Sequence, residues 1–229
     1  KKVRIITAIT ERALEFIKPG MTISLGGGSN VHDLAVALAT KPQLKLTLCT
    51  PSELTYQACL KLGLKMTTLT QIKDLDLAFD GCDSLDYQLR ALKSNGGIHT
   101  LEKICAQKAQ AYIILTKSER LTPQLNPAIP LTLEVISPAV STVSSLLSAP
   151  GIQIQQRLAS TVASFARTPS GNCLLDCYAQ NWHEITTFAH KAASLNGVIG
   201  TSFFEDYVTN VLALEADNSV KEIRKDEFK

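Results

Sequence analysis

The regular alternation of short apolar runs with amphipathic stretches in its first half is the feature that most constrains how this 229-residue sequence can fold. Residues 21–25 and 111–116 are apolar runs typical of buried strands, whereas residues 31–39 and 99–109 carry apolar side chains at helical spacing. Strands that alternate with helices in this way predict a parallel sheet covered by helices on both faces. We therefore expect an α/β fold with a Rossmann-like, parallel-sheet main domain.

The pattern changes after residues 121–130, where three prolines in ten residues indicate a linker or crossing point. Strand-like runs and helical stretches beyond it predict a smaller α+β lobe over residues 131–205. Residues 206–229 are expected to return to the main sheet, so the catalytic domain would comprise residues 1–130 and 206–229. The final segment, KEIRKDEFK, is rich in charge and predicts a solvated run.

Composition excludes several classes of partner. With 23 Lys and Arg against 21 Asp and Glu, the net charge of +2 predicts no basic face for nucleic acid, so any anion must be bound by a local site. No apolar run approaches the ~18 residues that a membrane span needs, and we expect no membrane partner. Six cysteines without a CxxC motif or clustered histidines predict free thiols, no metal site and a cytoplasmic location.

Polar clusters follow the predicted strands, at the edge where parallel α/β sheets bind ligands. The first cluster, Gly26-Gly27-Gly28-Ser29-Asn30, stands between a strand and a helix. Glycines there let the backbone approach a ligand, and the amides at a helix start favour a phosphate. The alternative is an ordinary turn in which Ser29 or Asn30 caps the helix.

Two further clusters bring together acidic and basic side chains. Asp80 and Asp83 flank a glycine turn, where crowded carboxyl groups suit acid–base chemistry, although Asp is also common in plain turns. Lys93 precedes the pair Gly96-Gly97, and Glu102 lies in the first turn of the next predicted helix. Glu102 could equally serve as a helix-dipole partner on the surface.

The motifs along the chain are a strand followed by GGGSN, then DGCD, then K-x₂-GG-x₄-EK, and later LTLEVI. The order and spacing of these motifs resemble ribose-5-phosphate isomerase of the A type. The resemblance covers almost the whole chain. It implies a metal-free and cofactor-free aldose–ketose isomerisation of ribose 5-phosphate and ribulose 5-phosphate in the pentose phosphate pathway. It also implies a homodimer or homotetramer, which we expect to associate through the smaller lobe.

The resemblance assigns roles to individual residues. Glu102 corresponds to the general base that moves a proton between C1 and C2. Asp80 and Asp83 correspond to carboxylates that handle the sugar hydroxyls, and Lys93 to the cation that stabilises the enediolate. The substrate-binding set comprises Gly26, Gly27, Gly28, Ser29, Asn30, Gly96, Gly97 and Arg120.

The sequence departs from the family pattern around the ligand. Gly27 and Asn30 replace the two threonines of GTGST, Ser84 replaces an acidic residue, and Ser94 and Asn95 replace two glycines of KGGG. Three alternatives therefore stay open: an isomerase with a shifted phosphosugar substrate, a non-catalytic sugar-phosphate-binding relative, and a CoA-transferase-like enzyme on a related fold that also uses a glutamate.

Overall fold

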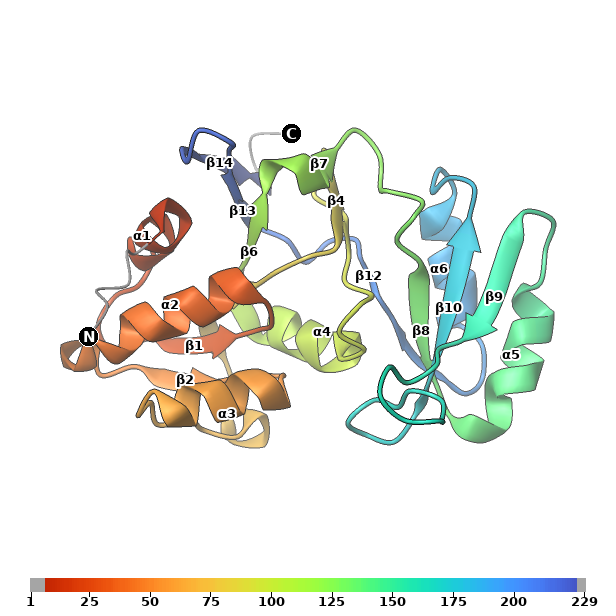
Figure 1. The fold of residues 1–229 in the computed structure, drawn as a ribbon, viewed down its shortest axis with the longest axis horizontal. Helices are drawn as coiled ribbons and strands as arrows, with labels where there is room; N and C mark the ends of the chain where they lie inside the picture. The colour runs from red at the N-terminus through yellow and green to blue at the C-terminus, as the bar shows by residue number, and fades with distance from the viewer. Residues whose placement is uncertain (1–6, 226–229) are drawn as a thin grey trace. The chain divides into compact units, whose positions relative to one another are not determined.

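The computed structural model describes residues 7–225, which divide into two compact units (Figure 1). The first unit contains the described residues up to Cys82, Leu101–Leu121 and the residues from Tyr207 onwards. The second contains Asp83–Thr100 and Thr122–Asp206. The sequence analysis assigned residues 83–100 and 122–130 to the main domain, whereas the packing of the chain groups them with the smaller unit.

A six-stranded sheet forms the centre of the first unit, in the order β14-β13-β6-β3-β1-β2. Its strands are β1 (Thr22–Leu25), β2 (Thr47–Cys49), β3 (Leu75–Asp80), β6 (Ala109–Lys117), β13 (Asn210–Leu214) and β14 (Val220–Arg224). All neighbouring pairs are parallel except β13 and β14. The α/β fold with a parallel sheet is therefore confirmed.

Helices flank this sheet and supply the rest of its core. They are α1 (Ala8–Leu14), α2 (Ser29–Ala39), α3 (Glu53–Lys61) and α4 (His99–Lys108). The first two residues of α4 belong to the second unit, and the rest of the helix belongs to the first. Ile23, Phe79 and Ile113 from the strands pack with Leu34 of α2 in one buried apolar cluster. None of the helices among residues 7–225 combines the length and apolar character that crossing a membrane requires.

The second unit is built on an antiparallel sheet in the order β11-β8-β10-β9. Its strands are β8 (Leu131–Val135), β9 (Ile152–Gln156), β10 (Cys173–Ala179) and β11 (Val198–Thr201), and its helices are α5 (Val140–Leu147) and α6 (Ile185–Ala193). The sheet and helices enclose a second apolar core that includes Leu133, Leu175 and Trp182. Short strands β4 (Ser84–Asp86), β5 (Ala91–Leu92) and β12 (Phe203–Phe204) pair beside it, and β7 (Leu121–Thr122) lies where the chain passes between units.

Two elements differ from the sequence expectation. Residues 197–204, one of the strand-like runs of the smaller lobe, form two strands, β11 and β12, with a break at Ser202. The charged C-terminal segment is not a solvated run throughout, because Val220–Arg224 pairs with β13 and buries Ile223; its last four residues lie outside the described range. One buried apolar residue among charged ones is enough for an edge strand. The many charged residues of this segment concealed that strand in the sequence.

The six cysteines, at positions 49, 59, 82, 105, 173 and 177, are all buried and free. The prediction of free thiols is thus confirmed.

Candidate active site

The glycine-rich loop leaves β1 at its carboxyl end, and its backbone is fixed by the neighbouring strand and helix. Gly26 N–H donates to Phe79 O (2.8 Å), and Thr55 Oγ1 donates to Gly26 O (2.7 Å). A Cβ atom at position 26 would overlap the Asp80 carboxyl group. Only glycine therefore allows the Asp80 carboxylate to lie against this loop.

The second half of the loop starts helix α2. Gly28 is the residue before the helix and has a φ of 98°, a backbone conformation that favours glycine. Ser29 and Asn30 are already helical, so the alternative in which one of them caps the helix is wrong. The first turn of α2 carries no acidic residue of its own, and the carboxylate that contacts this loop is that of Asp80.

The two positions at which the family pattern has threonine differ in what surrounds them. A Cβ atom at Gly27 would meet no other atom within 4 Å, so this position is open. Asn30 instead donates from Nδ2 to Leu115 O in β6 (3.3 Å), which directs its carboxamide toward the protein scaffold. Ser29 is exposed at the helix start and offers a hydroxyl beside the helix amides.

Asp80 ends β3, and its carboxyl group is 2% exposed. Oδ1 accepts hydrogen bonds from the N–H groups of Gly27 (3.1 Å) and Gly81 (2.8 Å). Oδ2 accepts one from the Tyr112 hydroxyl (2.9 Å). Both oxygens are thus oriented by fixed donors from three different segments of the chain.

Tyr112 was missed in the sequence analysis, which treated residues 111–116 only as a buried strand. Burial, followed by the charges of Asp80 and Glu102, raises the pKa of Tyr112 well above its ordinary value of 10.0. The hydroxyl therefore stays protonated and donates to Asp80. A signal was available, since a tyrosine in a buried strand needs a partner for its hydroxyl.

Glu102 lies in the first turn of α4 and is 5% exposed. Its charge, like that of Asp80, contributes to the raised pKa of Tyr112. Cys105 lies one turn further along the helix. Burial is the main cause that raises the pKa of its thiol to about 12, and the charges of Asp80 and Glu102 contribute in the same direction. The first unit thus holds two of the predicted catalytic carboxyl groups.

Arg120 lies in a short 3-10 helix, Ser118–Arg120, that follows β6. Its Nη1 donates to Cys82 O (2.6 Å), so the guanidinium is tied to the segment that follows Asp80. An arginine has five N–H donors, and this bond uses one of them.

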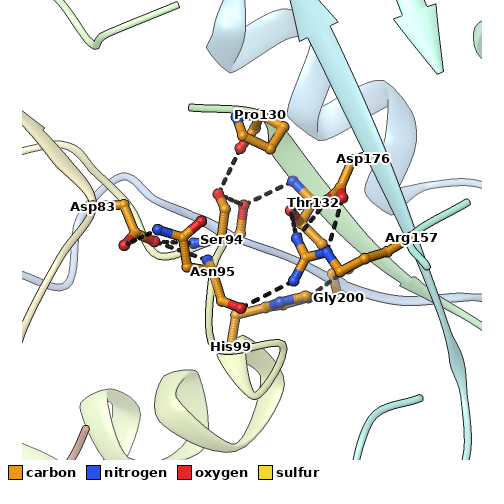
Figure 2. Close-up of polar contacts among 10 residues, drawn as sticks. Asp83, Ser94, Asn95, His99, Pro130, Thr132, Arg157, Asp176 and Gly200 are labelled. Carbon is orange, nitrogen blue, oxygen red and sulfur yellow. Dashed lines mark hydrogen bonds and ion pairs between the residues drawn. The ribbon is translucent and has the colours of Figure 1, made fainter. Parts of the chain in front are cut away.

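The other predicted site residues belong to the second unit, where Asp83 is held by the loop after β5 (Figure 2). Asp83 Oδ2 accepts from the N–H groups of Ser94 (2.7 Å) and Asn95 (2.9 Å), and Oδ1 accepts from Asn95 Nδ2 (2.7 Å). Lys93 is 6% exposed, with Nζ 5.8 Å from the centroid of the Phe204 ring.

Of the glycine pair that follows, only Gly97 is required by packing. Gly97 has a φ of 65°, and a Cβ atom there would approach Leu174 Cδ1 to 2.8 Å. Gly96 is exposed, and a Cβ atom there would make only ordinary contact with Ile98. The structure therefore groups the predicted residues into two sets: Gly26–Asn30, Asp80, Glu102 and Arg120 in the first unit, and Asp83, Lys93, Gly96 and Gly97 in the second.

Comparison with known proteins identifies the family. Residues 47–218 match the family model described as ribose 5-phosphate isomerase A (phosphoriboisomerase A). This chain belongs to that family. Ribose-5-phosphate isomerase A of Roseiflexus sp. (strain RS-1) is 32% identical over 198 residues, covering 85% of this chain and 84% of the relative. The enzyme of Listeria monocytogenes serovar 1/2a is 29% identical over 217 residues, covering 94% and 96%.

Solved structures of the family have the same fold. Ribose 5-phosphate isomerase A from Methanocaldococcus jannaschii superimposes with a TM-score of 0.87 at 26% identity, covering 95% of this chain and 97% of that one. Ribose 5 phosphate isomerase A from Neisseria gonorrhoeae, at 24% identity, gives a TM-score of 0.85 and supports the fold. The family resemblance predicted from the sequence motifs is thus confirmed.

Proposed function

We propose that this chain catalyses the interconversion of ribose 5-phosphate and ribulose 5-phosphate through an enediolate, the aldose–ketose isomerisation of the non-oxidative pentose phosphate pathway. Family membership supports the reaction class. The observation that carries the proposal is the buried Asp80 carboxylate, oriented by the Tyr112 hydroxyl, together with the buried Glu102 carboxylate of the same unit as the base.

Glu102 is the general base of this reaction. Moving a proton between C1 and C2 requires a carboxylate that faces the substrate and exchanges the same proton in both directions. A buried carboxylate in the first turn of α4 meets this requirement, because burial keeps water from competing for the proton.

Asp80 and Asp83 act on the substrate hydroxyls, and Lys93 stabilises the charge of the enediolate. Ring opening and proton movement between oxygens need oriented acceptors, and each carboxylate is held by three hydrogen bonds. A fixed ammonium group lowers the energy of a developing oxyanion most when it is kept from water. Lys93 is buried as this role requires.

The phosphate end of the substrate is bound by the loop of Gly26–Asn30. The amides at the start of α2, the exposed hydroxyl of Ser29 and the cation of Arg120 provide the anion-binding groups. Gly96 and Gly97 let the chain approach the sugar closely. No cofactor or metal takes part in this proposal.

A coupled isomerase assay over five- and six-carbon aldose phosphates, paired with calorimetric binding measurements, tests this function. We expect turnover of ribose 5-phosphate above that of every other sugar. Binding without turnover would identify a non-catalytic sugar-phosphate-binding relative, and faster turnover of another sugar would identify a shifted substrate. Labelling of Glu102 by an acyl-CoA would indicate the CoA-transferase alternative.

We further infer that the chain forms a homodimer or homotetramer through the second unit, in the cytoplasm. Leu158, Val162 and Phe165 are 71%, 63% and 46% exposed in one segment of that unit, an apolar surface that association would cover. Six free thiols fit a reducing compartment. Light scattering on the double variant Leu158→Asp with Val162→Asp should give a smaller particle than the parent chain; an unchanged mass would contradict this interface.

A further inference from the structure

An uninterrupted path of hydrogen bonds in the second unit joins Asp83 to a partly buried ion pair (Figure 2). Asn95 provides two of the three donors to the Asp83 carboxylate, and the Asn95 carbonyl accepts from Arg157 Nη1 (3.1 Å). The other donor groups of Arg157 bind Asp176, from Nε to Oδ2 (2.8 Å) and from Nη2 to Oδ1 (2.5 Å). The path thus runs from Asp83 through Asn95 and Arg157 to Asp176.

The far end of this path is anchored in the antiparallel sheet. Asp176 lies in β10, with a side chain 6% exposed, and its Oδ1 also accepts from Thr132 Oγ1 of β8 (2.6 Å). Arg157 directly follows β9, and its N–H donates to Leu174 O of β10 (2.9 Å). Three strands therefore fix the guanidinium group.

Sheet stability alone does not account for this arginine. A buried ion pair contributes little net stability, because the desolvation of both charges offsets their attraction. The donors on Nε and Nη2 of Arg157 are sufficient to bind Asp176 and Thr132. The remaining nitrogen, Nη1, donates to the Asn95 carbonyl outside the sheet. The rigid fork of arginine directs Nε and Nη2 to the carboxylate and Nη1 to the carbonyl, whereas the three N–H donors of a lysine share one nitrogen and cannot span both groups in these fixed directions.

The loop between these groups carries side chains where the family pattern has glycine. Asn95 Nδ2 holds the second oxygen of Asp83, a bond that glycine cannot make. Ser94 Oγ donates to Pro130 O (2.5 Å) and bonds the Ser202 hydroxyl (2.9 Å). The loop is consequently fixed by its own side chains on one side and by Arg157 on the other.

We infer that Arg157 and Asn95 are positioning residues of the isomerase, which act through Asp83. Arg157, held by Asp176, fixes the Asn95 carbonyl, and Asn95 fixes both oxygens of the Asp83 carboxylate. Neither residue acts on the reacting carbons. The kinetic part of this inference rests on the function proposed above, whereas the structural part does not.

The first test is Arg157→Lys in the full chain, with Arg167→Lys as the matched control. Arg167 is an exposed arginine of the same unit whose guanidinium contacts Cys173 Sγ instead of the loop. Arg157→Lys should lower kcat for ribose 5-phosphate at least about tenfold, because small displacements of a reacting group are costly. KM should change less than about twofold, since the phosphate is bound elsewhere. The control should keep both constants.

A second set of variants guards against misfolding. Arg157→Met combined with Asp176→Leu removes both charges, so no unpaired charge stays buried, and it should give the same loss of kcat. Asn95→Ala should lower kcat by itself. Combining Asn95→Ala with Arg157→Lys should cost less than the product of the single effects, because both act through Asp83.

Amide hydrogen exchange provides a readout that does not depend on catalysis. The N–H groups of Ser94 and Asn95 are donors to Asp83, so Arg157→Lys should accelerate their exchange at least about tenfold, and Arg167→Lys should not. Unchanged exchange at these amides in folded Arg157→Lys overturns the inference, as does wild-type kcat in an active enzyme. An inactive parent chain whose loop amides still respond would refute only the proposed function.

Discussion

The two loops that carry the predicted site residues hold their carboxylates in different ways. At Gly26–Asn30, the absence of side chains lets Asp80 lie against the backbone, and backbone amides with one tyrosine orient it. At Ser94–Gly97, side chains have been added, and Asn95 contributes its carboxamide to Asp83. The first loop has lost hydroxyl groups relative to the family pattern, whereas the second has gained polar groups.

This difference separates ligand binding from the orientation of catalytic groups. Of the two positions that lost a threonine, Gly27 faces open space, so its change affects what the loop offers to a ligand, whereas Asn30 bonds Leu115 O. The positions that gained side chains, Ser94 and Asn95, bond groups of the protein itself. A change at Gly27 should therefore alter KM, and a change at Asn95 should alter kcat.

The largest effect is expected from Glu102→Gln, which keeps the shape of the side chain and removes its basicity. It should lower kcat at least about 10²-fold with little change in KM, the usual scale for a general base. The exposed Glu119→Gln is the matched control and should retain full activity. Near-normal kcat in Glu102→Gln, measured by the coupled assay, would show that another group is the base.

A pair of alanine substitutions tests the first loop directly. Gly26→Ala places a methyl group on the Asp80 carboxylate and should lower kcat by roughly 10²-fold, by displacing that group. Gly27→Ala meets no atom and should leave kcat and thermal stability close to those of the parent chain. Equal effects from the two substitutions, in parallel kinetics and thermal unfolding, would contradict the described contact between Gly26 and Asp80.

Tyr112→Phe tests whether the orientation of Asp80 depends on the hydroxyl. Loss of this bond should lower kcat about tenfold, the cost of a hydrogen bond to a charged group. Because the pKa of Tyr112 is raised, its hydroxyl stays protonated as the pH rises, and kcat of the parent should not fall through tyrosine ionisation up to about pH 10. A pH–rate profile checks this, with the exposed Tyr87→Phe as control. An alkaline loss of kcat that disappears in Tyr112→Phe would disprove the assignment.

The smallest effect is expected from restoring both threonines of the first loop. Gly27→Thr with Asn30→Thr should lower KM for ribose 5-phosphate about fivefold, the effect of roughly one additional hydrogen bond. kcat should stay unchanged, because Asp80 and Glu102 are not touched. If KM rises instead while turnover of another phosphosugar improves, the loop of this chain is adapted to that other sugar.

The sequence predicted the parallel sheet correctly, because alternating apolar and amphipathic runs are local patterns. It also named Asp80, Asp83, Lys93 and Glu102 through the family resemblance. Tyr112 was missed because its partner is 32 residues away in the chain. Contacts of this kind leave no periodic signal.

Arg157 shows the same limit more strongly. Its bond to the Asn95 carbonyl spans 62 residues, and nothing around position 157 distinguishes it from an exposed arginine. The edge strand Val220–Arg224 was concealed for a different reason, since its charged residues outnumber the one side chain that it buries. Propensity and charge describe a segment by itself, whereas these features depend on what lies beside it.

The open space around Gly27 also bears on how such an enzyme can diverge. Because a Cβ atom at this position would meet no other atom within 4 Å, a small substitution there should not disturb the sheet or the Asp80 carboxylate. If the loop binds the substrate as proposed, exchange of this single residue should change substrate affinity without moving the proposed catalytic groups. Descendants of this chain could acquire a new phosphosugar preference at position 27 without passing through an unstable intermediate.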